Sequence, residues 1–501
     1  MADLSFDLPE QYNAARLLWD NLPARADSIA IYHEGGNSTY AELVRQAAQF
    51  GHAMRAHAEP GDRVLLFMED EPAYPAAIMG ALRAGLVPMM INTLSTPDLI
   101  AFYLEDSAAR VVMCSDGFRD RFADCAVPVL TPDAARGMPD TLDEYPTRRS
   151  DMAFWMYSSG STGRPKGIVH KHEDPAYTAA TYSAGVLGLG PDDICFSVPK
   201  IFFAYGFGNS VTFPFAVGAA SVLLSGRPTP ARVFETVDRF RPTAFFGLPT
   251  LYTALLNDPA ADGADMSSVR LCLSAAEILS EDIASAWLHR FGMPVIEGLG
   301  STEMLHIYLS NTATEQTPGS AGRVVAGYDV RLVDPDGAEV HGAGQGVMHV
   351  RGRSAAQYYW NRPDKTAETM IDGWINTGDR FVRDADGRFF FKGRADDLVK
   401  VSGQWVWPME VELALNEHPQ VMESCVLAVP MADGRTTLCA WVAVKSGSVG
   451  DDRLRAALVS HAKAELLPHK YPRHIEFLAN LPKTGTDKID RQTLRATWRA
   501  S

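Results

Sequence analysis

The sequence predicts an α/β protein with a large N-terminal domain of helix-covered β-sheets plus a β-barrel-like region, and a small mobile α+β C-terminal domain. Its 501 residues exceed what one hydrophobic core usually organises, which favours at least two domains. From about residue 60 to 300, short β-rich runs alternate with helical patterns. Between 319 and 395, extended segments punctuated by glycine replace that alternation.

The alternating region begins with a strand-like run over 62–69 and a helical pattern over 72–85. Alternation of this kind is typical of parallel sheets whose faces are covered by helices. Further strand-like runs follow at 109–115, 220–225, 242–249, 269–275 and 293–300.

The glycine-punctuated region predicts antiparallel strands that close the large domain. The runs GVMHVRG (346–352) and GRFFFKGR (387–394) read as strands, and PDG (335–337) and ADG (385–387) read as turns.

The last hundred residues predict a separate α+β domain. A helix is expected over 408–418, strands over 423–430 and 437–444, and a second helix over 451–467. In that helix Leu454, Leu458, Ala462 and Leu466 repeat at four-residue spacing, which gives one apolar face. We therefore expect domains at 1–393 and 397–501, joined by a hinge at 394–396 that includes Asp396.

Composition excludes several classes of function. The formal charge of −15 argues against a nucleic-acid partner, because phosphate backbones bind basic faces. No basic region followed by an apolar run opens the chain, and no stretch is long and apolar enough for a membrane span. The six cysteines lack C-x-x-C spacing and predict buried thiols in a reducing cytoplasm.

The segment YSSGSTGRPKGIVH (157–170) concentrates glycines, hydroxyl groups and two cations. Glycine lets backbone N–H groups approach a ligand closely, and hydroxyls and cations add donors, so the segment predicts a polyphosphate cradle. It is not a Walker loop, because Lys166 follows Pro165 and precedes Gly167.

Four further stretches follow in order: GLGSTE (298–303), WINTGD (374–379), GRADDLVKVSG (393–403) and LPKTGTDKIDR (481–491). Together with the glycine-rich segment they resemble the motifs of the adenylate-forming acyl-CoA synthetase and luciferase superfamily, over nearly the whole chain. The resemblance implies two steps. A carboxylate attacks the α-phosphate of ATP to give an acyl-adenylate and pyrophosphate, and a thiol then displaces AMP.

The resemblance also implies residue roles. Thr302 would touch the α-phosphate, Glu303 would bind Mg²⁺, and Lys166 would neutralise the leaving pyrophosphate. Asp379 and Arg394 would hold the ribose. The remaining expected ATP-binding residues are the phosphate loop Ser159, Gly160, Ser161, Thr162 and Gly163, the adenine face Ala275, Ala276 and Glu277, and Gly298, Leu299, Gly300 and Ser301.

Lys488 is the lysine that the resemblance places in the first step, where it would bridge the substrate carboxylate and the α-phosphate. The small domain would rotate about the hinge between half-reactions and remove it from the site. Lys483 is the competing lysine, but Lys488 holds the position before Ile-Asp-Arg that the motif specifies. The motif has glycine before the lysine, whereas this chain has Asp487. A carboxylate there could hold Lys488 out of the site or point to solvent, and we expect the second because adjacent side chains on an extended loop point apart.

The stretches 200–220, 298–311 and 400–406 closely resemble the benzoate-CoA ligase branch. That resemblance implies a pocket for an aromatic ring formed by Ala204, Tyr205, Gly300, His306 and Ile307. Core packing is the alternative for the aromatic run near 202–207, and a residue can serve both purposes.

The predicted function is an ATP-dependent aryl-acid:CoA ligase acting on benzoate or a substituted benzoate. The small-molecule partners are an aromatic or cyclic carboxylic acid, ATP with Mg²⁺, and coenzyme A, and the chain is expected as a monomer or homodimer. One alternative is an adenylation enzyme that loads another cyclic or bulky acid onto CoA or a carrier-protein phosphopantetheine. Another is an inactive adenylate-binding protein.

Overall fold

The computed structural model describes residues 6–158, 164–395, 399–401, 404–431, 435–445, 447–468, 470–483 and 489–498. These fall into two compact units. The first contains 1–331, 349–377 and 385–390, and the second contains 332–348, 378–384 and 391–501.

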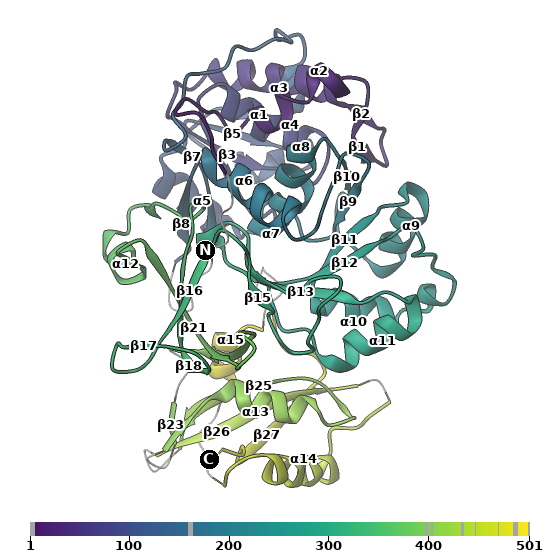
Figure 1. The fold of residues 1–501 in the computed structure, drawn as a ribbon, viewed down its shortest axis with the longest axis vertical. Coiled ribbons are helices and arrows are strands. Elements are labelled where there is room, and N and C mark those ends of the chain that lie inside the picture. Colours follow the sequence, from purple (N-terminus) through teal and green to yellow (C-terminus); the bar gives the residue numbers. More distant parts are fainter. Residues whose placement is uncertain are drawn as a thin grey trace. The chain divides into compact units, whose positions relative to one another are not determined.

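A nine-stranded sheet and a seven-stranded sheet form the framework of the first unit (Figure 1). In spatial order, the nine strands are β15 (Arg323–Val324), β14 (Ile307–Ser310), β13 (Val295–Gly300), β12 (Leu271–Ser274), β11 (Ala244–Gly247), β9 (Ile194–Ser197), β10 (Ala220–Leu223), β1 (Ile29–His33) and β2 (Ser38–Thr39). The seven strands are β19 (Tyr358–Tyr359), β8 (Lys166–Lys171), β7 (Met152–Ser158), β4 (Val87–Met90), β3 (Arg63–Phe67), β5 (Val111–Cys114) and β6 (Val129–Leu130).

Both sheets are parallel in the middle and antiparallel toward an edge. Parallel pairs run from β1 through β10, β9, β11 and β12 to β13, and from β6 through β5, β3 and β4 to β7. The pairs β13–β14, β14–β15, β7–β8 and β8–β19 are antiparallel. The two short strands β15 and β19 come from the glycine-punctuated region, so part of that region extends the two large sheets.

The helices of the first unit cover these sheets. They are α1 (Arg16–Trp19), α2 (Leu22–Arg25), α3 (Tyr40–Arg55), α4 (Ala73–Arg83), α5 (Pro97–Ser107), α6 (Glu173–Thr178), α7 (Ala204–Phe207), α8 (Phe213–Val217), α9 (Pro230–Phe240), α10 (Pro249–Asn257), α11 (Glu281–Phe291) and α12 (Pro363–Thr369). The 3₁₀ and π turns are η1 (Asp116–Phe122), η2 (Pro132–Ala135), η3 (Ala179–Ala184), η4 (Gly208–Thr212), η5 (Pro259–Gly263) and η6 (Thr302–Met304).

Strand alternation sends neighbouring apolar residues into different cores. Leu66 of β3 packs in the cluster that holds α3 and α4, whereas Leu65 packs in a second cluster on the other face of the same sheet. Leu223 of β10 joins the first cluster, and Val222 joins a third. Residues from both large sheets therefore share one core with α3 and α4, which explains why the parallel strands are almost wholly apolar.

A third sheet is built from the glycine-punctuated region and has residues in both units. Its strand order is β17 (Glu339–Val340), β16 (Asp329–Val333), β18 (Gly344–Arg351), β21 (Trp374–Arg383) and β20 (Met370–Ile371), with β22 (Phe389–Arg394) paired to β21. The pairs β16–β17 and β20–β21 are antiparallel, as predicted.

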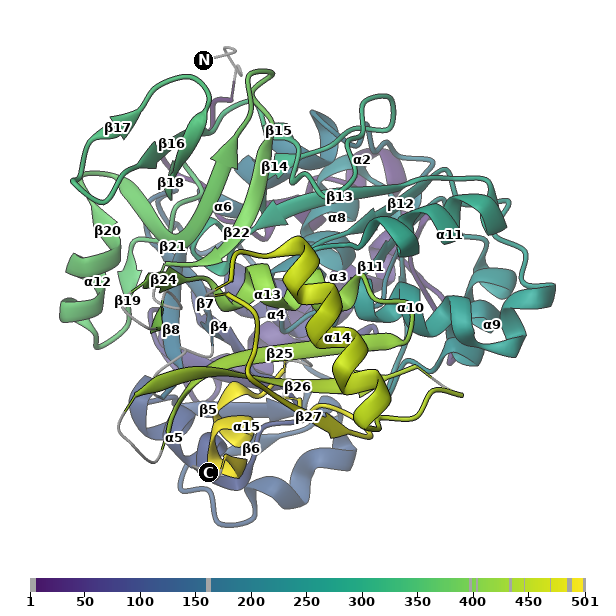
Figure 2. The same cartoon turned by 90° about the horizontal axis from the view of Figure 1, so that it is seen from below.

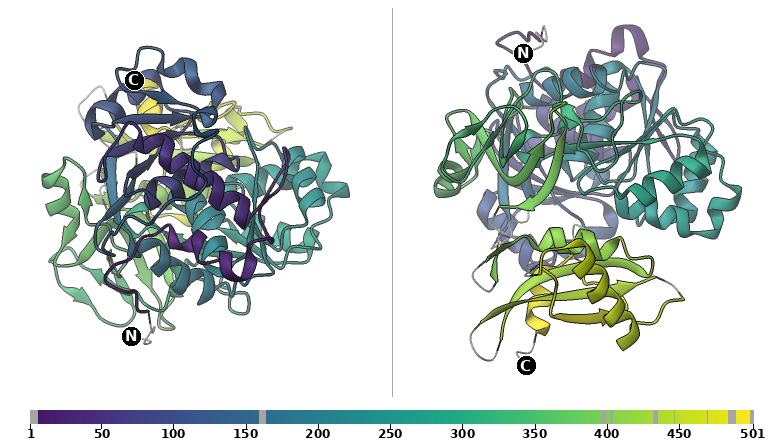
Figure 3. Two further views of the ribbon diagram at one scale, coloured as in Figure 1. Left: turned by 90° about the horizontal axis from the view of Figure 1, so that it is seen from above. Right: turned by 60° about the horizontal axis from the view of Figure 1, so that its bottom comes forward.

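The C-terminal part of the second unit contains a sheet covered on both faces (Figures 2 and 3). Helices α13 and α14 pack on one face in a single apolar cluster, and α15 packs on the other. Asp451 caps α14 by accepting a hydrogen bond from the Leu454 backbone N–H. The elements are β23 (Val399–Val401), β24 (Gln404–Val406), α13 (Pro408–Asn416), β25 (Val421–Pro430), β26 (Thr436–Val444), α14 (Asp452–Glu465), β27 (His474–Leu478) and α15 (Arg491–Thr497).

All six cysteines are free thiols, and five of them are buried as predicted. Cys125 is partly exposed because it lies in the connection between η1 and β6. In the described part of the chain, no helix is both long enough and apolar enough to cross a bilayer.

Candidate active site

Lys166 and Glu303 are brought together by the ring of Tyr359. The Lys166 ammonium lies 4.3 Å from the centre of that ring, within the range of a cation–π contact. The Tyr359 hydroxyl donates a hydrogen bond to Glu303 Oε1 at 2.8 Å. One aromatic side chain thus contacts both the cation and the carboxylate that the sequence predicted for the phosphates and the metal.

The turn that carries Thr302 and Glu303 is tied to other elements through its backbone. Leu305, which ends the turn, has φ 65°, a conformation that a leucine adopts only when its surroundings enforce it. Three successive carbonyls accept hydrogen bonds: Thr302 O from His170 Nε2 (2.8 Å), Glu303 O from Ala356 N (2.8 Å) and Met304 O from Ser354 Oγ (2.9 Å). These bonds hold the backbone from which the Thr302 and Glu303 side chains project.

The predicted adenine-face residues 275–277 and the predicted ATP-binding residues 298–301 lie toward the carboxyl ends of two adjacent parallel strands. Ser274, the last residue of β12, pairs with Glu297 of β13, so residues 275–277 follow the end of β12 beside β13, which continues to Gly300 and pairs there with β14. Ala275 is buried, whereas Ala276 and Glu277 are exposed. The carboxyl end of a parallel sheet is where open α/β folds bind their ligands.

Glu297, next to this edge, is largely buried and held by the Leu279 backbone N–H, which donates to Oε1 at 3.3 Å. Burial raises the pKa of Glu297 to about 8, and the Leu279 hydrogen bond only partly opposes that shift. At neutral pH this carboxyl group is therefore mostly protonated.

Asp379 and Arg394 form a pair within the second unit. Arg394 Nη1 lies 3.1 Å from Asp379 Oδ1, and both side chains are partly exposed. Gly378 has φ 66°, and a Cβ atom there would lie 2.7 Å from Arg394 Nη2. Gly378 thus lies within β21 at a positive φ that glycine adopts without strain, and the absence of a Cβ leaves room for the Arg394 guanidinium.

Seven predicted site residues lie outside the described residues: Ser159, Gly160, Ser161, Thr162, Gly163, Asp396 and Lys488. Asp487 also lies there. The competing Lys483 is described, and its ammonium forms an ion pair with the Glu423 carboxylate.

The other four residues predicted for the aromatic pocket lie near the fifth, His306. The ring centres of Tyr205 and His306 are 5.4 Å apart. Ile307 pairs with Gly300 across β13 and β14, and a Cβ atom at Gly300 would lie 2.4 Å from the His306 carbonyl oxygen. Ala204 precedes Tyr205 on α7 and is buried. The structure thus groups Tyr205, His306, Ile307 and Gly300 in one region.

The approach of η4 to His306 depends on Gly208. A Cβ atom at Gly208 would lie 2.3 Å from His306 Cδ2. The ring also contacts Phe213, with centres 4.4 Å apart, and Tyr182, at 5.4 Å. An aromatic enclosure therefore surrounds this histidine.

Several polar atoms in this enclosure are buried without a hydrogen-bond partner among the described residues. They are the Tyr205 hydroxyl, both side-chain amide atoms of Asn209, and both ring nitrogens of His306. Burial lowers the pKa of His306 to about 3, so the ring is neutral at pH 7. Unpaired polar atoms cost free energy when buried, and a bound ligand or water that pairs them would remove that cost.

Sequence reasoning assigned no role to Tyr359, His170, Phe213 or Asn209. His170 closes the glycine-rich segment, and strand alternation from Lys166 would have placed both side chains on one face. Tyr359 is 56 residues from Glu303 and belongs to none of the motifs. Only the pairing of β8 with β19 identifies it as a site residue.

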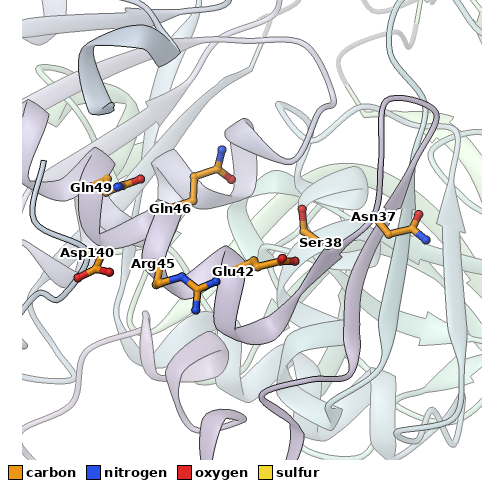
Figure 4. Close-up of a pocket in the computed structure, with 7 residues that line it drawn as sticks. All are labelled: Asn37, Ser38, Glu42, Arg45, Gln46, Gln49 and Asp140. Carbon is orange, nitrogen blue, oxygen red and sulfur yellow. The ribbon is translucent and has the colours of Figure 1, made fainter. Parts of the chain in front are cut away.

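A polar hollow on the surface of α3 has a volume of about 400 Å³ (Figure 4). Asn37, Ser38, Glu42, Arg45, Gln46, Gln49 and Asp140 line it, and none of them is a predicted site residue. Glu42 already caps α3 by bonding Thr39. We assign none of these lining residues a role in the proposed reaction.

Comparison with known proteins identifies the family to which the chain belongs. Residues 18–360 match the AMP-binding enzyme family, and residues 410–488 match the AMP-binding enzyme C-terminal domain. The chain belongs to the AMP-binding enzyme family. The predicted fold class and the predicted class of enzyme, an AMP-forming acid–thiol ligase, are confirmed, and the family implies the use of ATP and CoA.

This AMP-binding enzyme is 42% identical to a benzoate–CoA ligase of Thauera aromatica, over 98% of this chain and 97% of the relative. Among solved structures, it resembles an anthranilate CoA ligase, AuaEII, in complex with anthranoyl-AMP (35% identity, TM-score 0.93, 98% of each chain). It also resembles a benzoate CoA ligase from Burkholderia xenovorans LB400 (37% identity, TM-score 0.90, 97% of this chain and 100% of that one). The predicted benzoate-CoA ligase branch is confirmed.

Replacing Tyr359 by phenylalanine tests whether its hydroxyl orients Glu303. We expect the rate of acid-dependent ATP–pyrophosphate exchange to fall about ten-fold and the Mg²⁺ concentration for half-maximal rate to rise, because a hydrogen bond to a charged group is lost. Tyr358→Phe is the matched control, because Tyr358 is the neighbouring residue of the same strand and points to the other face. Equal rates in both variants would contradict this role.

Proposed function

We propose that this enzyme is an ATP-dependent aryl-acid:CoA ligase that acts on benzoate or a small substituted benzoate. The observation that carries the proposal is the aromatic enclosure around Tyr205 and His306, which lies next to the turn bearing Thr302 and Glu303. An acid bound with its ring in this enclosure would direct its carboxylate toward the residues expected to bind the α-phosphate. The relatives named as benzoate or anthranilate CoA ligases support the same substrate class.

The neutral enclosure favours an uncharged ring. His306 stays unprotonated at pH 7, so the enclosure offers no cation to a second carboxylate. The unpaired atoms of Asn209, Tyr205 and His306 can bond a hydroxyl or amino substituent. An added group without a polar partner would change affinity by only about 1–3 kcal/mol, so several small aryl acids remain substrates in this proposal.

In the first step we assign the residues as follows. Thr302 contacts the α-phosphate, Lys166 stabilises the departing pyrophosphate, and Lys488 bridges the carboxylate and the α-phosphate. The segment 159–163 holds the β- and γ-phosphates. Residues 275–277 bind the adenine, residues 298–301 contribute to the ATP site, and Asp379 with Arg394 binds the ribose.

The residues at Glu303 fit a magnesium ion. Among the described residues, no group of three or more His, Cys, Asp or Glu side chains could hold a metal alone. Mg²⁺ needs no such cage, because it binds through one or two carboxylates together with phosphate oxygens and water. Glu303, oriented by Tyr359, provides such a carboxylate. When bound with ATP, the ion would neutralise phosphate charge.

In the second step the C-terminal domain, which we propose rotates about 394–396, would carry Lys488 away and admit the thiol. Free CoA is the proposed acceptor. A monomer or homodimer in the cytoplasm remains the expected form.

Acid-dependent ATP–pyrophosphate exchange across aryl, alicyclic and fatty acids tests the proposal. We expect exchange with benzoate and its hydroxy or amino derivatives, and much less with fatty acids. Exchange driven best by fatty acids would contradict the substrate class. If none of the acids stimulates exchange, the enzyme assignment is contradicted.

Because His306 is buried and neutral, we expect the free energy of unfolding to decrease as the pH is lowered. Its pKa is about 3 in the folded chain and 6.5 as the ordinary value, so the unfolded chain binds the proton first as pH falls. The stability that neutral His306 contributes is present above pH 6.5 and is lost between 6.5 and about 3. We expect a loss of about 1.4 kcal/mol per pH unit in that window. Urea unfolding at pH 7 and 5 should show a smaller loss in His306→Asn, and equal losses would contradict the assignment.

A further inference from the structure

A buried histidine–aspartate pair lies at the end of β8. His170 Nδ1 is 2.9 Å from Asp174 Oδ2, and His170 Nε2 is 2.8 Å from the Thr302 carbonyl oxygen. Neither side chain of the pair has exposed surface. The imidazole ring is stacked on Phe154, with ring centres 5.4 Å apart and planes at 22°. The ring is therefore held in place on three sides.

The hydrogen bond to the Thr302 carbonyl fixes one proton of the His170 ring. A carbonyl oxygen can only accept, so Nε2 carries a proton for Thr302. Asp174 is itself held by Lys171, because its Oδ2 accepts from the Lys171 backbone N–H at 2.9 Å and its Oδ1 lies 3.4 Å from the Lys171 ammonium. Each ring nitrogen of His170 therefore has an oxygen atom within hydrogen-bond distance, Asp174 Oδ2 at Nδ1 and the Thr302 carbonyl at Nε2.

Strand β8 reaches the Thr302–Glu303 turn at two points. Lys166, Ile168 and His170 alternate along β8 and face the same side. Lys166 meets Glu303 through the Tyr359 ring, and His170 meets the Thr302 carbonyl directly. The strand that ends the phosphate loop thus also holds the backbone of the turn.

We propose that His170, oriented by Asp174, is a positioning residue for adenylate formation: it fixes the Thr302 carbonyl and thereby the directions of the Thr302 and Glu303 side chains. This inference rests on the proposed function. A displacement of about 1 Å at a reacting group can cost about a hundred-fold in rate, so a residue that touches no substrate can control this step.

The test compares two substitutions, each of which can retain one of the two hydrogen bonds that the imidazole makes. His170→Gln places an amide near the position of Nε2 and can still donate to the Thr302 carbonyl. His170→Asn places an amide near Nδ1 and can bond only Asp174. We expect His170→Asn to lower the maximal rate of benzoate-dependent ATP–pyrophosphate exchange by about ten-fold or more and to raise the half-saturating Mg²⁺ concentration. We expect His170→Gln to stay within about three-fold of the unaltered enzyme, with the KM for benzoate unchanged in both variants.

His172→Asn is the matched control for loss of a buried histidine. His172 Nδ1 accepts from the Ala14 backbone N–H at 3.0 Å, and an asparagine oxygen can replace it there. Thermal unfolding of all three variants separates stability from rate. Equal exchange in His170→Asn and His170→Gln, or rates that follow the unfolding temperature alone, would overturn the inference. An unaltered enzyme that shows no exchange with any acid would instead contradict the proposed function.

Discussion

Lys488→Ala should lower the rate of adenylate formation by about 100- to 1000-fold, the cost typical of removing a group that stabilises charge only in the transition state. In the assigned role, the ammonium bridges two negatively charged groups while the carboxylate attacks phosphorus. The competing Lys483 is paired with Glu423, and we do not expect it to take the place of Lys488. We therefore expect the effect to be confined to the first half-reaction.

Two measurements separate that role from a general defect. Benzoate-dependent ATP–pyrophosphate exchange reports the first half-reaction, and thioester formation from supplied benzoyl-adenylate and CoA reports the second. Lys488→Ala should lose the first and retain the second, whereas the control Lys483→Ala should retain both. Undiminished exchange in Lys488→Ala would refute the assignment.

Glu303→Gln should lower exchange by about a hundred-fold, which corresponds to about 2.7 kcal/mol of activation free energy. Glutamine keeps an oxygen for the Tyr359 hydroxyl but removes the negative charge expected to bind Mg²⁺. The rate should recover partly as the Mg²⁺ concentration is raised, which a simple folding defect would not do.

Glu297→Gln is the matched control for that substitution. Glu297 lies six residues earlier on β13, and its pKa of about 8 leaves it mostly protonated at pH 7. Replacing it by glutamine therefore removes little charge, and exchange should change by only a few-fold. Similar losses in both variants would show that the effect at Glu303 does not depend on its charge.

The fold was predictable where local patterns dominate. The run over 62–69 became β3, and the helical pattern over 72–85 became α4. The helix expected over 451–467 is α14, with Leu454, Leu458 and Ala462 buried. Each pattern indicates which face of a helix or strand is buried. That face is determined mainly by the local sequence.

The pairing of distant segments was not predictable in this way. Residues 358–359 lie in the glycine-punctuated region but pair with β8, where Tyr359 stands opposite Ile168. That register puts Tyr359 between Lys166 and Glu303, and nothing in its local sequence indicates it. The motifs identified Lys166 and Glu303 themselves, and the resemblance identified Tyr205 and His306, whereas the contacts that orient them come only from the assembled sheets.

Product analysis of the complete reaction tests the central claim most directly. The protein is incubated with benzoate, ATP, Mg²⁺ and either free CoA or a holo-carrier protein, and nucleotides and thioesters are quantified by mass spectrometry. We expect one AMP and one benzoyl-CoA for each ATP consumed, with free CoA as the preferred acceptor. Formation of ADP, or of AMP without any aroyl-CoA thioester, would contradict it.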